Sequence, residues 1–325
     1  MKLGIIGCGL IGQKRAQAGK KLGLELVSAC DLNIPAAQDL ANRFGGQAVN
    51  DYRDVLSSDA DILVVAVTHD KLAQIALEAV KAGKHLLLEK PGAVTSWALE
   101  PVLEEAIERN LSVKVGYNHR FHPSLQKARE LVDQGALGQL MYVRGRYGHG
   151  GRLGYEKEWR MRREIGGGGE LLDQGSHLID LSLWFLGGFA TVQAQLPNYY
   201  WKADVEDNAF LLLTTSLGQC AMLHATWTEW KNMFSFEIVG QLGKIAIDGL
   251  GGSYGPEQIA YHKMLPEMGP PETVIWQYPF PDQSWEKEFE ELTKAIDQKR
   301  QPQGGLGEAI EVLRLIDIVY AQNRK

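Results

Sequence analysis

The sequence predicts an α/β protein of two domains, an N-terminal doubly wound parallel sheet followed by an α+β domain with a large, mostly antiparallel sheet. Two observations support this division. Short apolar runs alternate with segments of helical spacing over the first 116 residues, and closely spaced strand candidates replace this pattern from about residue 190. The chain has 325 residues, which is enough for two ordinary cores. We expect the first domain to comprise residues 1–117 and the second residues 118–325.

The first domain is predicted from five apolar runs that have the character of buried parallel strands. Strands covered on both faces are continuously apolar, whereas half-exposed strands alternate. Between the runs, apolar residues recur at helical spacing, for example at Leu72, Ile75, Ala76 and Ala79. The strand candidates are Leu3–Ile6, Leu24–Ala29, Ile62–Val67, His85–Leu88 and Leu111–Val115.

The second domain is predicted to begin with a helix at Pro123–Gln134 and a strand at Leu140–Tyr147. Another helix follows the glycine run Gly166–Gly169 and ends near Leu186. Turn signals such as Ser216-Leu217-Gly218 separate the later strands, as in an antiparallel meander. The remaining expected elements are strands Thr191–Gln195, Asn208–Thr215, Cys220–Thr228, Phe234–Val239 and Lys244–Ile247, and amphipathic helices Trp285–Gln298 and Gly307–Asn323.

Composition argues against several classes of protein. The net charge of −6 disfavours a general nucleic-acid binder, which presents a basic surface to phosphates. No apolar run reaches the roughly 18 residues that span a bilayer, and the start Met1–Ile6 has the character of a first strand rather than a signal peptide. The three cysteines, at positions 8, 30 and 220, lack the spacing of a disulfide framework. Reduced thiols in a cytoplasmic protein are the simplest interpretation.

A turn with the pattern Gly7-x-Gly9-x-x-Gly12 follows the first strand and opens a helix at about Leu10. The first glycine permits a tight turn, the second lets a pyrophosphate approach the backbone, and the third lets helix and strand pack closely. The N–H groups of Leu10 and Ile11 belong to the helix N-terminus, which faces the phosphates. The pattern and its context predict a Rossmann-type dinucleotide site; a plain βα turn is the alternative.

Asp31 indicates which dinucleotide is bound. It lies 19 residues after Gly12, at the end of the second strand, where a carboxylate can accept hydrogen bonds from both ribose hydroxyls. The same carboxylate repels a 2′-phosphate, and Leu32 and Asn33 supply no arginine to bind one. Lys14 and Arg15 are near in sequence, but we expect such early helix positions to carry solvated charges. NAD is therefore expected rather than NADP.

The tripeptide Glu89-Lys90-Pro91 directly follows the strand candidate His85–Leu88. Ligands of open α/β sheets bind at the carboxyl ends of the strands, which places Lys90 at the mouth of the predicted site. A lysine there can donate a hydrogen bond to a reacting hydroxyl. A purely structural Lys-Pro step fits the same pattern.

A second candidate group lies in the segment Gly166–Asp180. Asp173 and His177 are four residues apart and share one face if the segment is an α-helix. A carboxylate can orient an imidazole, whose ordinary pKa of about 6.5 suits a general base. Asp180 is a competing partner for His177, and a simple ion pair on a helix face is the alternative. We expect no metal site, because no further cluster completes a coordination shell.

Together these motifs resemble the glucose–fructose oxidoreductase/inositol dehydrogenase (Gfo/Idh/MocA) family. The matching stretches are the glycine turn, AGKHLLLEKPGAVT at 82–95, GYNHRFHPSLQKARELV at 116–132 and GGGELLDQGSHLIDLSLWFLG at 167–187. The resemblance implies catalytic roles for Lys90, Asp173 and His177, and it places Asn118 and Arg120 of the Asn-x-Arg-Phe stretch near the nicotinamide and the substrate. It further implies a C-terminal sheet that mediates assembly into a homodimer or homotetramer.

The resemblance also marks a departure beside the cofactor. Many members carry Thr-Pro-Asn or Thr-Pro-His where this chain has Thr68-His69-Asp70. His69 therefore lacks the conformational restriction of proline in a loop that normally borders the cofactor. We expect Thr68, His69 and Glu89 to line the cofactor site with the residues named above.

The segment Arg144–Arg163 is a local basic stretch within an acidic chain, interleaved with Tyr155, Trp159 and other aromatic residues. Arginine forks suit phosphate or carboxylate, and aromatic rings can stack on a base or a sugar. Tyr155, Trp159 and Arg160 are therefore candidates for binding a sugar-like substrate that carries negative charge. A solvated strand face or a subunit contact would give the same composition.

These features predict an oxidoreductase that transfers a hydride between a secondary alcohol of a sugar, cyclitol or nucleotide sugar and NAD. In this hypothesis His177, steadied by Asp173, takes the hydroxyl proton while Lys90 stabilises the oxygen. Two alternatives remain: a glycosidase that uses tightly held NAD by transient oxidation, and a non-catalytic sensor of sugar or cofactor.

Overall fold

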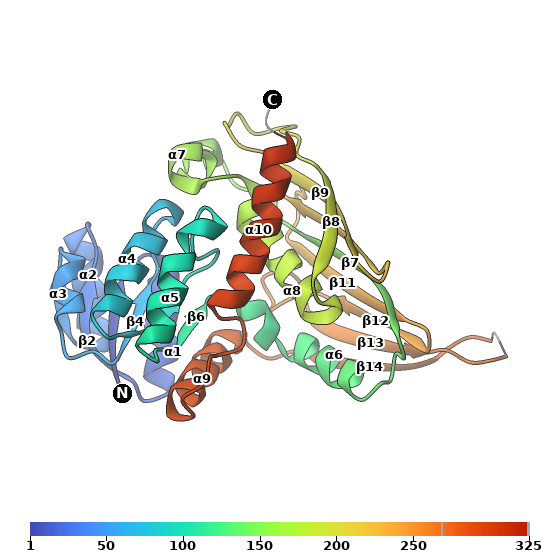
Figure 1. The fold of residues 1–325 in the computed structure, drawn as a ribbon, viewed down its shortest axis with the longest axis horizontal. Coiled ribbons are helices and arrows are strands. Elements are labelled where there is room, and N and C mark those ends of the chain that lie inside the picture. The colour runs from blue at the N-terminus through green and yellow to red at the C-terminus, as the bar shows by residue number, and fades with distance from the viewer. Residues whose placement is uncertain (268, 324–325) are drawn as a thin grey trace. The chain divides into compact units, whose positions relative to one another are not determined.

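The computed structural model describes residues 1–267 and 269–323, which form two compact units (Figure 1). Unit 1 comprises Met1–Asn118 and Trp285–Leu313, and unit 2 comprises His119–Ser284 and the chain from Arg314 onward. The C-terminal segment Trp285–Leu313 thus belongs with the N-terminal part of the chain. This differs from the expected division, in which all of residues 118–325 formed the second domain.

Unit 1 contains a parallel six-stranded sheet with the order β3-β2-β1-β4-β5-β6. The parallel pairing and helical crossovers confirm the predicted doubly wound class. Its elements are β1 (Lys2–Ile6), α1 (Leu10–Lys21), β2 (Glu25–Cys30), α2 (Ile34–Phe44), β3 (Gln47–Val49), α3 (Tyr52–Leu56), β4 (Ile62–Val65), α4 (His69–Lys81), β5 (His85–Leu88), η1 (Ser96–Ala98), α5 (Glu100–Glu108), β6 (Val113–Val115) and α9 (Ser284–Asp297).

The helices of unit 1 cover both faces of its sheet. On one face, Leu3 and Ile5 of β1 belong to a core cluster with residues of α1, with Leu40 of α2 and with Phe289 and Leu292 of α9. Helices α4 and α5 pack against each other, and α4 also packs against β4 and β5. Because Phe289 and Leu292 are fully buried in this cluster, the hydrophobic effect assigns α9 to unit 1 in spite of its distant position in the sequence.

Unit 2 contains an eight-stranded sheet with the order β14-β13-β12-β11-β7-β10-β9-β8. Its elements are η2 (Asn118–Phe121, entering from unit 1), α6 (Pro123–Asp133), β7 (Leu140–Gly148), η3 (Tyr155–Lys157), η4 (Trp159–Met161), α7 (Arg163–Gly166), η5 (Leu171–Gly175), α8 (Ser176–Leu186), β8 (Phe189–Gln195), β9 (Asn208–Thr215), β10 (Cys220–Thr226), β11 (Met233–Gly240), β12 (Gly243–Asp248), β13 (Glu257–Lys263) and β14 (Glu272–Tyr278). The last helix, α10 (Leu306–Asn323), belongs to unit 1 up to Leu313 and to unit 2 from Arg314 onward. Helices α6 and α8 pack against this sheet.

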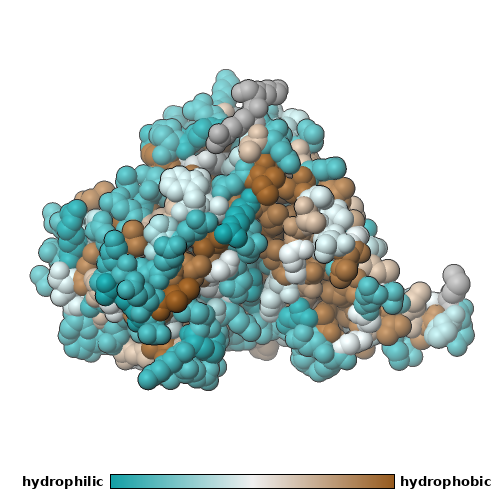
Figure 2. All heavy atoms as spheres, viewed as in Figure 1, coloured by the Kyte–Doolittle hydropathy of each residue, from teal (hydrophilic) through white to brown (hydrophobic). Residues whose placement is uncertain are grey.

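The second sheet is not the simple meander that the turn signals predicted. Strand β7, the first of the unit, lies between β11 and β10 and pairs in parallel with β10, while the other pairs are antiparallel. Inward residues of β7 such as Val143 are buried whereas Arg144 is exposed, so one of its faces packs on the core. In Figure 2, brown hydrophobic atoms gather where this sheet is drawn, whereas unit 1 presents mainly hydrophilic atoms.

A buried carboxylate ties β13 to the start of α6. Glu257 accepts hydrogen bonds from the backbone N–H of Ser124 at 2.9 Å, from its hydroxyl at 2.6 Å and from the N–H of Gly251 at 3.1 Å. His122 Nδ1 lies 3.0 Å from the same carboxylate. Burial by itself would raise the pKa of Glu257, but the hydrogen bonds from His122 and Ser124 outweigh it and lower the pKa from 4.5 to about 2.

We expect this carboxylate to make unit 2 sensitive to acid. Because the pKa of Glu257 is lower in the folded chain, its contribution is complete above about pH 5 and is lost as the pH falls toward 2, in total roughly 3 kcal/mol. Urea unfolding of Glu257→Gln at neutral pH should show a loss of this order, and the variant should lose less further stability between pH 5 and 3 than the wild type. Glu130→Gln, on the exposed surface of α6, is the control. Parallel pH curves for wild type and Glu257→Gln would contradict this explanation.

Candidate active site

The glycine turn has the geometry of a phosphate cradle. A side chain at Gly7, whose φ is +98°, would place Cβ 2.2 Å from the carbonyl oxygen of Ala66, and one at Gly12 would place it 2.0 Å from the carbonyl oxygen of Gly7. The close packing of the turn therefore leaves room only for glycine at these two positions. By contrast, nothing lies within 4 Å of a Cβ at Gly9, the residue before α1. The open space over Gly9 at a helix N-terminus fits the pyrophosphate of a dinucleotide.

Asp31 is held in place at the end of β2. Its carboxylate accepts hydrogen bonds from the N–H of Cys8, at 2.8 Å, and from the N–H of Asn33, at 2.8 Å. The first of these ties the acidic residue directly to the glycine turn. The arrangement suits a ribose diol and leaves a negative charge where NADP would carry its 2′-phosphate. The residues present thus fit NAD.

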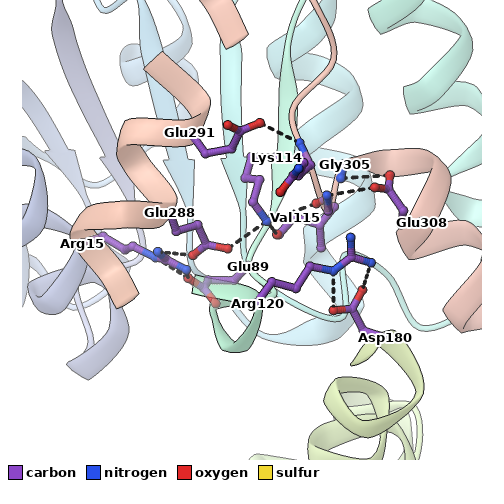
Figure 3. A network of polar contacts seen from close by, with 12 residues as sticks. Arg15, Glu89, Lys114, Val115, Arg120, Asp180, Glu288, Glu291, Gly305 and Glu308 are labelled. Carbon is purple, nitrogen blue, oxygen red and sulfur yellow. Dashed lines mark hydrogen bonds and ion pairs between the residues drawn. The ribbon is translucent and has the colours of Figure 1, made fainter. Parts of the chain in front are cut away.

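Glu89 and Lys90 follow β5, with Lys90 half-buried in a turn that the N–H of Gly92 closes by donating to the carbonyl of Glu89. The Glu89 carboxylate accepts a hydrogen bond from Nε of Arg15 on α1, at 2.7 Å (Figure 3). Gly116 lies against this pair, since a Cβ there would be 2.8 Å from Glu89 Oε2 and 3.1 Å from the backbone nitrogen of Lys90. The backbone of Lys90 is therefore enclosed by the Arg15–Glu89 pair and by Gly116, which follows β6.

The same guanidinium joins a larger buried network. Arg15 Nη1 donates to Glu288 of α9 at 2.6 Å, and Glu288 lies 2.9 Å from the ammonium of Lys114 on β6 (Figure 3). The side chains of Arg15, Lys114 and Glu288 are fully buried. The expectation that Arg15 carries a solvated charge is therefore wrong, because two carboxylates compensate for its desolvation. With both carboxylates engaged, Arg15 is not presented to a 2′-phosphate.

The departure at Thr68-His69-Asp70 leaves the loop well formed. Helix α4 begins at His69, which is buried, and Thr68 donates a hydrogen bond from its hydroxyl to the Asp70 carboxylate at 2.6 Å. The loop follows β4, next to β1 in the sheet. Thr68 and His69 therefore lie at the same carboxyl edge as the glycine turn, where the cofactor-binding residues are expected.

In unit 2, the glycine run is required by close packing rather than by flexibility. A Cβ at Gly168 would lie 1.9 Å from the hydroxyl of Tyr320, and one at Gly169 would lie 2.0 Å from the carbonyl oxygen of Glu206. Glu206 accepts hydrogen bonds from Tyr320, at 2.7 Å, and from the N–H of Gly169, at 3.0 Å. Burial raises the pKa of Glu206 in spite of these bonds. The run thereby fixes the start of the segment that carries Asp173 and His177.

That segment is not a continuous α-helix. Leu171–Gly175 forms one π-helical turn, and α8 begins only at Ser176. The wider i→i+5 turn means that the α-helical spacing, from which a shared face for Asp173 and His177 was inferred, does not apply between them. Such π-turns are frequent at functional sites. The orientation of His177 by Asp173 stays a prediction. The Asp173 carboxylate lies 3.3 Å from Arg160 Nε.

His177 is buried and its ring stacks on that of His119, with ring centroids 3.8 Å apart and an angle of 23° between the planes. His119 belongs to the Asn118–Phe121 turn, in which the sequence singled out Asn118 and Arg120 but not His119. Arg120 forms a two-pronged ion pair with Asp180 of α8, at 2.8 and 2.6 Å (Figure 3). Asp180, considered a competing partner for His177, is thus bonded to Arg120.

Three arginines of the basic stretch 144–163 have carboxylate partners. Arg144 lies on β7 and pairs with Glu237 at 2.7 Å, Arg152 pairs with Glu158 at 2.5 Å, and Arg160 pairs with Asp173. Local carboxylates therefore neutralise three of its arginines. Of the aromatic candidates, Tyr155 is buried and contacts other rings, and Trp159 stacks under Arg160 at 4.3 Å.

The described residues contain no group of three or more histidine, cysteine or acidic side chains that could hold a metal ion. Among the helices of residues 1–267 and 269–323, none is long and apolar enough to cross a membrane. All three cysteines are free thiols, and burial raises the pKa of Cys8 to about 12 and that of Cys30 to about 11.

The fold and the dinucleotide cradle define an NAD-binding oxidoreductase, and comparison with known proteins agrees. A family model described as an oxidoreductase family with an NAD-binding Rossmann fold matches residues 1–117, and one described as the GFO/IDH/MocA C-terminal domain matches residues 125–246. The chain belongs to the Gfo/Idh/MocA family of oxidoreductases. Both the recognised family and the expected cofactor, NAD, are confirmed.

Relatives with assigned names are dehydrogenases. The chain is 24% identical to a levoglucosan dehydrogenase of Pseudarthrobacter phenanthrenivorans over 76% of its own length and 73% of that protein. It is 28% identical to an inositol 2-dehydrogenase of Salmonella typhimurium (61% and 58%) and 30% identical to a D-glucoside 3-dehydrogenase of Escherichia coli (63% and 59%). The latter two matches thus span less than two thirds of the relatives.

Solved structures share the whole fold. A levoglucosan dehydrogenase in complex with NADH and L-sorbose superposes with a TM-score of 0.88 at 22% identity, over 99% of this chain and 96% of that one. An oxidoreductase domain protein from Kribbella flavida gives 0.86 at 24% identity, over 98% and 96%. At these identities the likeness establishes the architecture of both units.

The glycine turn yields a paired test. Gly9→Ala should leave the free energy of unfolding unchanged, because open space surrounds its Cβ, but should weaken NAD binding by at least about tenfold, or ~1.4 kcal/mol. Gly12→Ala should instead destabilise unit 1 by about 1–3 kcal/mol, because its Cβ overlaps the Gly7 carbonyl. Calorimetric NAD titration and urea unfolding separate the two effects. Undiminished NAD affinity in Gly9→Ala would show that the pyrophosphate lies elsewhere.

Proposed function

We propose that the chain is an NAD-dependent dehydrogenase that oxidises a secondary alcohol of a neutral sugar or cyclitol. The observation that carries the substrate class is that its named relatives act on levoglucosan, inositol and D-glucosides, all of which are uncharged polyols. The ion pairs of Arg144, Arg152 and Arg160 support the same choice, since these three arginines have carboxylate partners within the chain. A sugar acid or nucleotide sugar is the competing substrate class.

In the proposed mechanism, His177 accepts the hydroxyl proton of the substrate. Lys90 donates a hydrogen bond to the same oxygen and stabilises its developing charge, and Asp173 steadies the imidazole of His177. NAD held by the glycine turn and Asp31 would supply the hydride acceptor that the oxidation of the alcohol to a carbonyl requires. Burial of His177 protects the proton transfer from bulk water. Tyr155, Trp159, Arg120 and Asn118 are proposed to border the sugar and the nicotinamide.

The assignment predicts that Lys90→Ala and His177→Ala lose turnover by about 10²–10⁴-fold while NAD affinity stays near that of the wild type. The measurement is absorbance at the NADH band across neutral polyols, sugar acids and nucleotide sugars, with calorimetric NAD titration as the control for folding. Near-normal turnover in either variant would overturn its role. A clear preference for anionic sugars would overturn the neutral substrate class.

The same screen separates the other functions. A glycosidase acting by transient oxidation would cleave glycosides without accumulating NADH, and a sensor would bind sugar without turnover. The cytoplasmic location suggested by the unpaired cysteines stays a prediction.

We further propose that the eight-stranded sheet joins copies of the chain into a homodimer or homotetramer. Phe210 and Leu212 of β9 and Met222 of β10 are 39–44% exposed, on the face opposite the buried Leu211 and Leu223. They line a groove of about 740 Å³ together with polar residues that include Arg144, Arg146, His224 and Glu237. An apolar surface of this kind on a sheet is typical of a protein interface.

A charge on this face should therefore lower the oligomeric state. Leu212→Glu is expected to shift the mass measured by size-exclusion chromatography with light scattering toward the monomer, because a buried unpaired carboxylate is costly. Leu217→Glu, at an exposed turn of the same unit, should leave the mass unchanged. Identical masses for both variants and the wild type would refute this interface.

A further inference from the structure

We propose that His119 is a positioning residue that sets the ring plane of His177 for proton transfer. The proposal rests on the function proposed for His177 and extends it to a residue with no role in the mechanism above. Its basis is that the Asn118–Phe121 turn is attached to helix α8 at two points. His119 of the turn contacts His177, and the next residue, Arg120, contacts Asp180, about one helical turn further along α8.

The first attachment is the ring stack. A centroid separation of 3.8 Å with planes 23° apart brings the two imidazoles into van der Waals contact face to face. The torsion that turns a histidine ring about its Cβ–Cγ bond is broad, so an unsupported imidazole swings easily. A flat neighbour against its face removes this freedom. Because stacking uses the face, the ring nitrogens at the edge stay in the plane where protons are exchanged.

The second attachment keeps His119 from moving away. Arg120, the next residue, holds Asp180 by two charge-assisted hydrogen bonds, and both side chains are almost fully buried. Paired hydrogen bonds of this kind fix orientation as well as distance. Since Asp180 is three residues after His177 on α8, the ion pair and the stack fix the turn to the same stretch of helix.

His119 is itself confined by three further rings. Tyr147 of β7 and Phe234 of β11 meet it edge-on at 5.0 and 5.8 Å, and His122 does so at 5.8 Å. All of these side chains are buried. Tyr147 also meets the edge of His177, at 6.1 Å. The His177 ring packs on His119, and His119 in turn packs on residues of β7 and β11, the central strands of the eight-stranded sheet. The plane of the His177 ring is thus held by the sheet through His119.

A flat ring, rather than an imidazole as such, is what this geometry requires at position 119. His119→Phe keeps a flat aromatic face, whereas His119→Leu fills a similar apolar space without one. We therefore expect the kcat of His119→Phe to stay within about threefold of the wild type and that of His119→Leu to fall by at least about tenfold, with KM and NAD affinity unchanged in both.

The measurements are steady-state kinetics, urea unfolding and NMR of histidine-labelled protein. Ring current from the aromatic neighbour should shift the His177 Hε1 resonance in the wild type and in His119→Phe, and the shift should be lost in His119→Leu. Wild-type kcat in His119→Leu, or equal losses of kcat and stability in both variants, would overturn the proposal. An unchanged His177 resonance in His119→Leu would overturn the stack itself.

These outcomes are distinguishable from failure of the proposed function. The NMR experiment needs no substrate, so it reports on the stack whether or not His177 is the base. If His177→Ala is inactive while His119→Leu turns over normally, only the positioning role fails. If His177→Ala keeps its activity, the assignment of the base fails and the positioning role fails with it.

Discussion

Two positive and two negative side chains in the interior of unit 1 constrain its assembly more strongly than any single apolar contact. Arg15, Lys114, Glu89 and Glu288 are at most 11% exposed and are joined in one chain of ion pairs. Removing a charge from water costs several kcal/mol unless partners replace the solvent, and a missing partner leaves that cost uncompensated. The four residues come from α1, β6, the end of β5 and α9, so their ion pairs join these four parts of the unit.

This network also connects the two halves of the cofactor site. Helix α1 starts at the glycine turn, and Glu89 is bonded to Lys90 in the chain. The Arg15–Glu89 pair therefore ties the helix that starts at the phosphate cradle to the residue that precedes Lys90. Gly116 allows β6 to end against this pair without a side chain in the way. The ion pairs in unit 1 and the ring stack in unit 2 have one feature in common, since in both a buried side chain is held by buried neighbours.

Sequence reasoning succeeded where the signal is local. The glycine turn, the strand His85–Leu88 and the strand Asn208–Thr215 depend on short patterns, and the structure has all three at the expected residues. Sequence reasoning did not predict features that depend on contacts between residues far apart in the chain. Arg15 is buried because Glu288, 273 residues later, meets it. The place of β7 in the middle of its sheet depends on pairing that turn signals do not encode.

The missed features of the candidate site have the same origin. The π-turn at Leu171–Gly175 directly follows a glycine run that packs on Tyr320 and Glu206, and helical periodicity reveals neither feature. His119 occupies the variable position of a recognised motif, so only its contact with His177 marks it. A histidine directly between two singled-out residues, Asn118 and Arg120, was the one available signal.

The discontinuous composition of unit 1 has a consequence for synthesis of the chain. On the ribosome, residues 1–118 emerge long before α9, and until Glu288 appears neither Arg15 nor Lys114 can form its ion pair with that carboxylate. The first sheet can form early, but its charged interior becomes neutral only when nine-tenths of the polypeptide has been made. Completion of the nucleotide-binding unit thus waits for the intervening unit to be translated, which couples the maturation of the two halves within a single molecule.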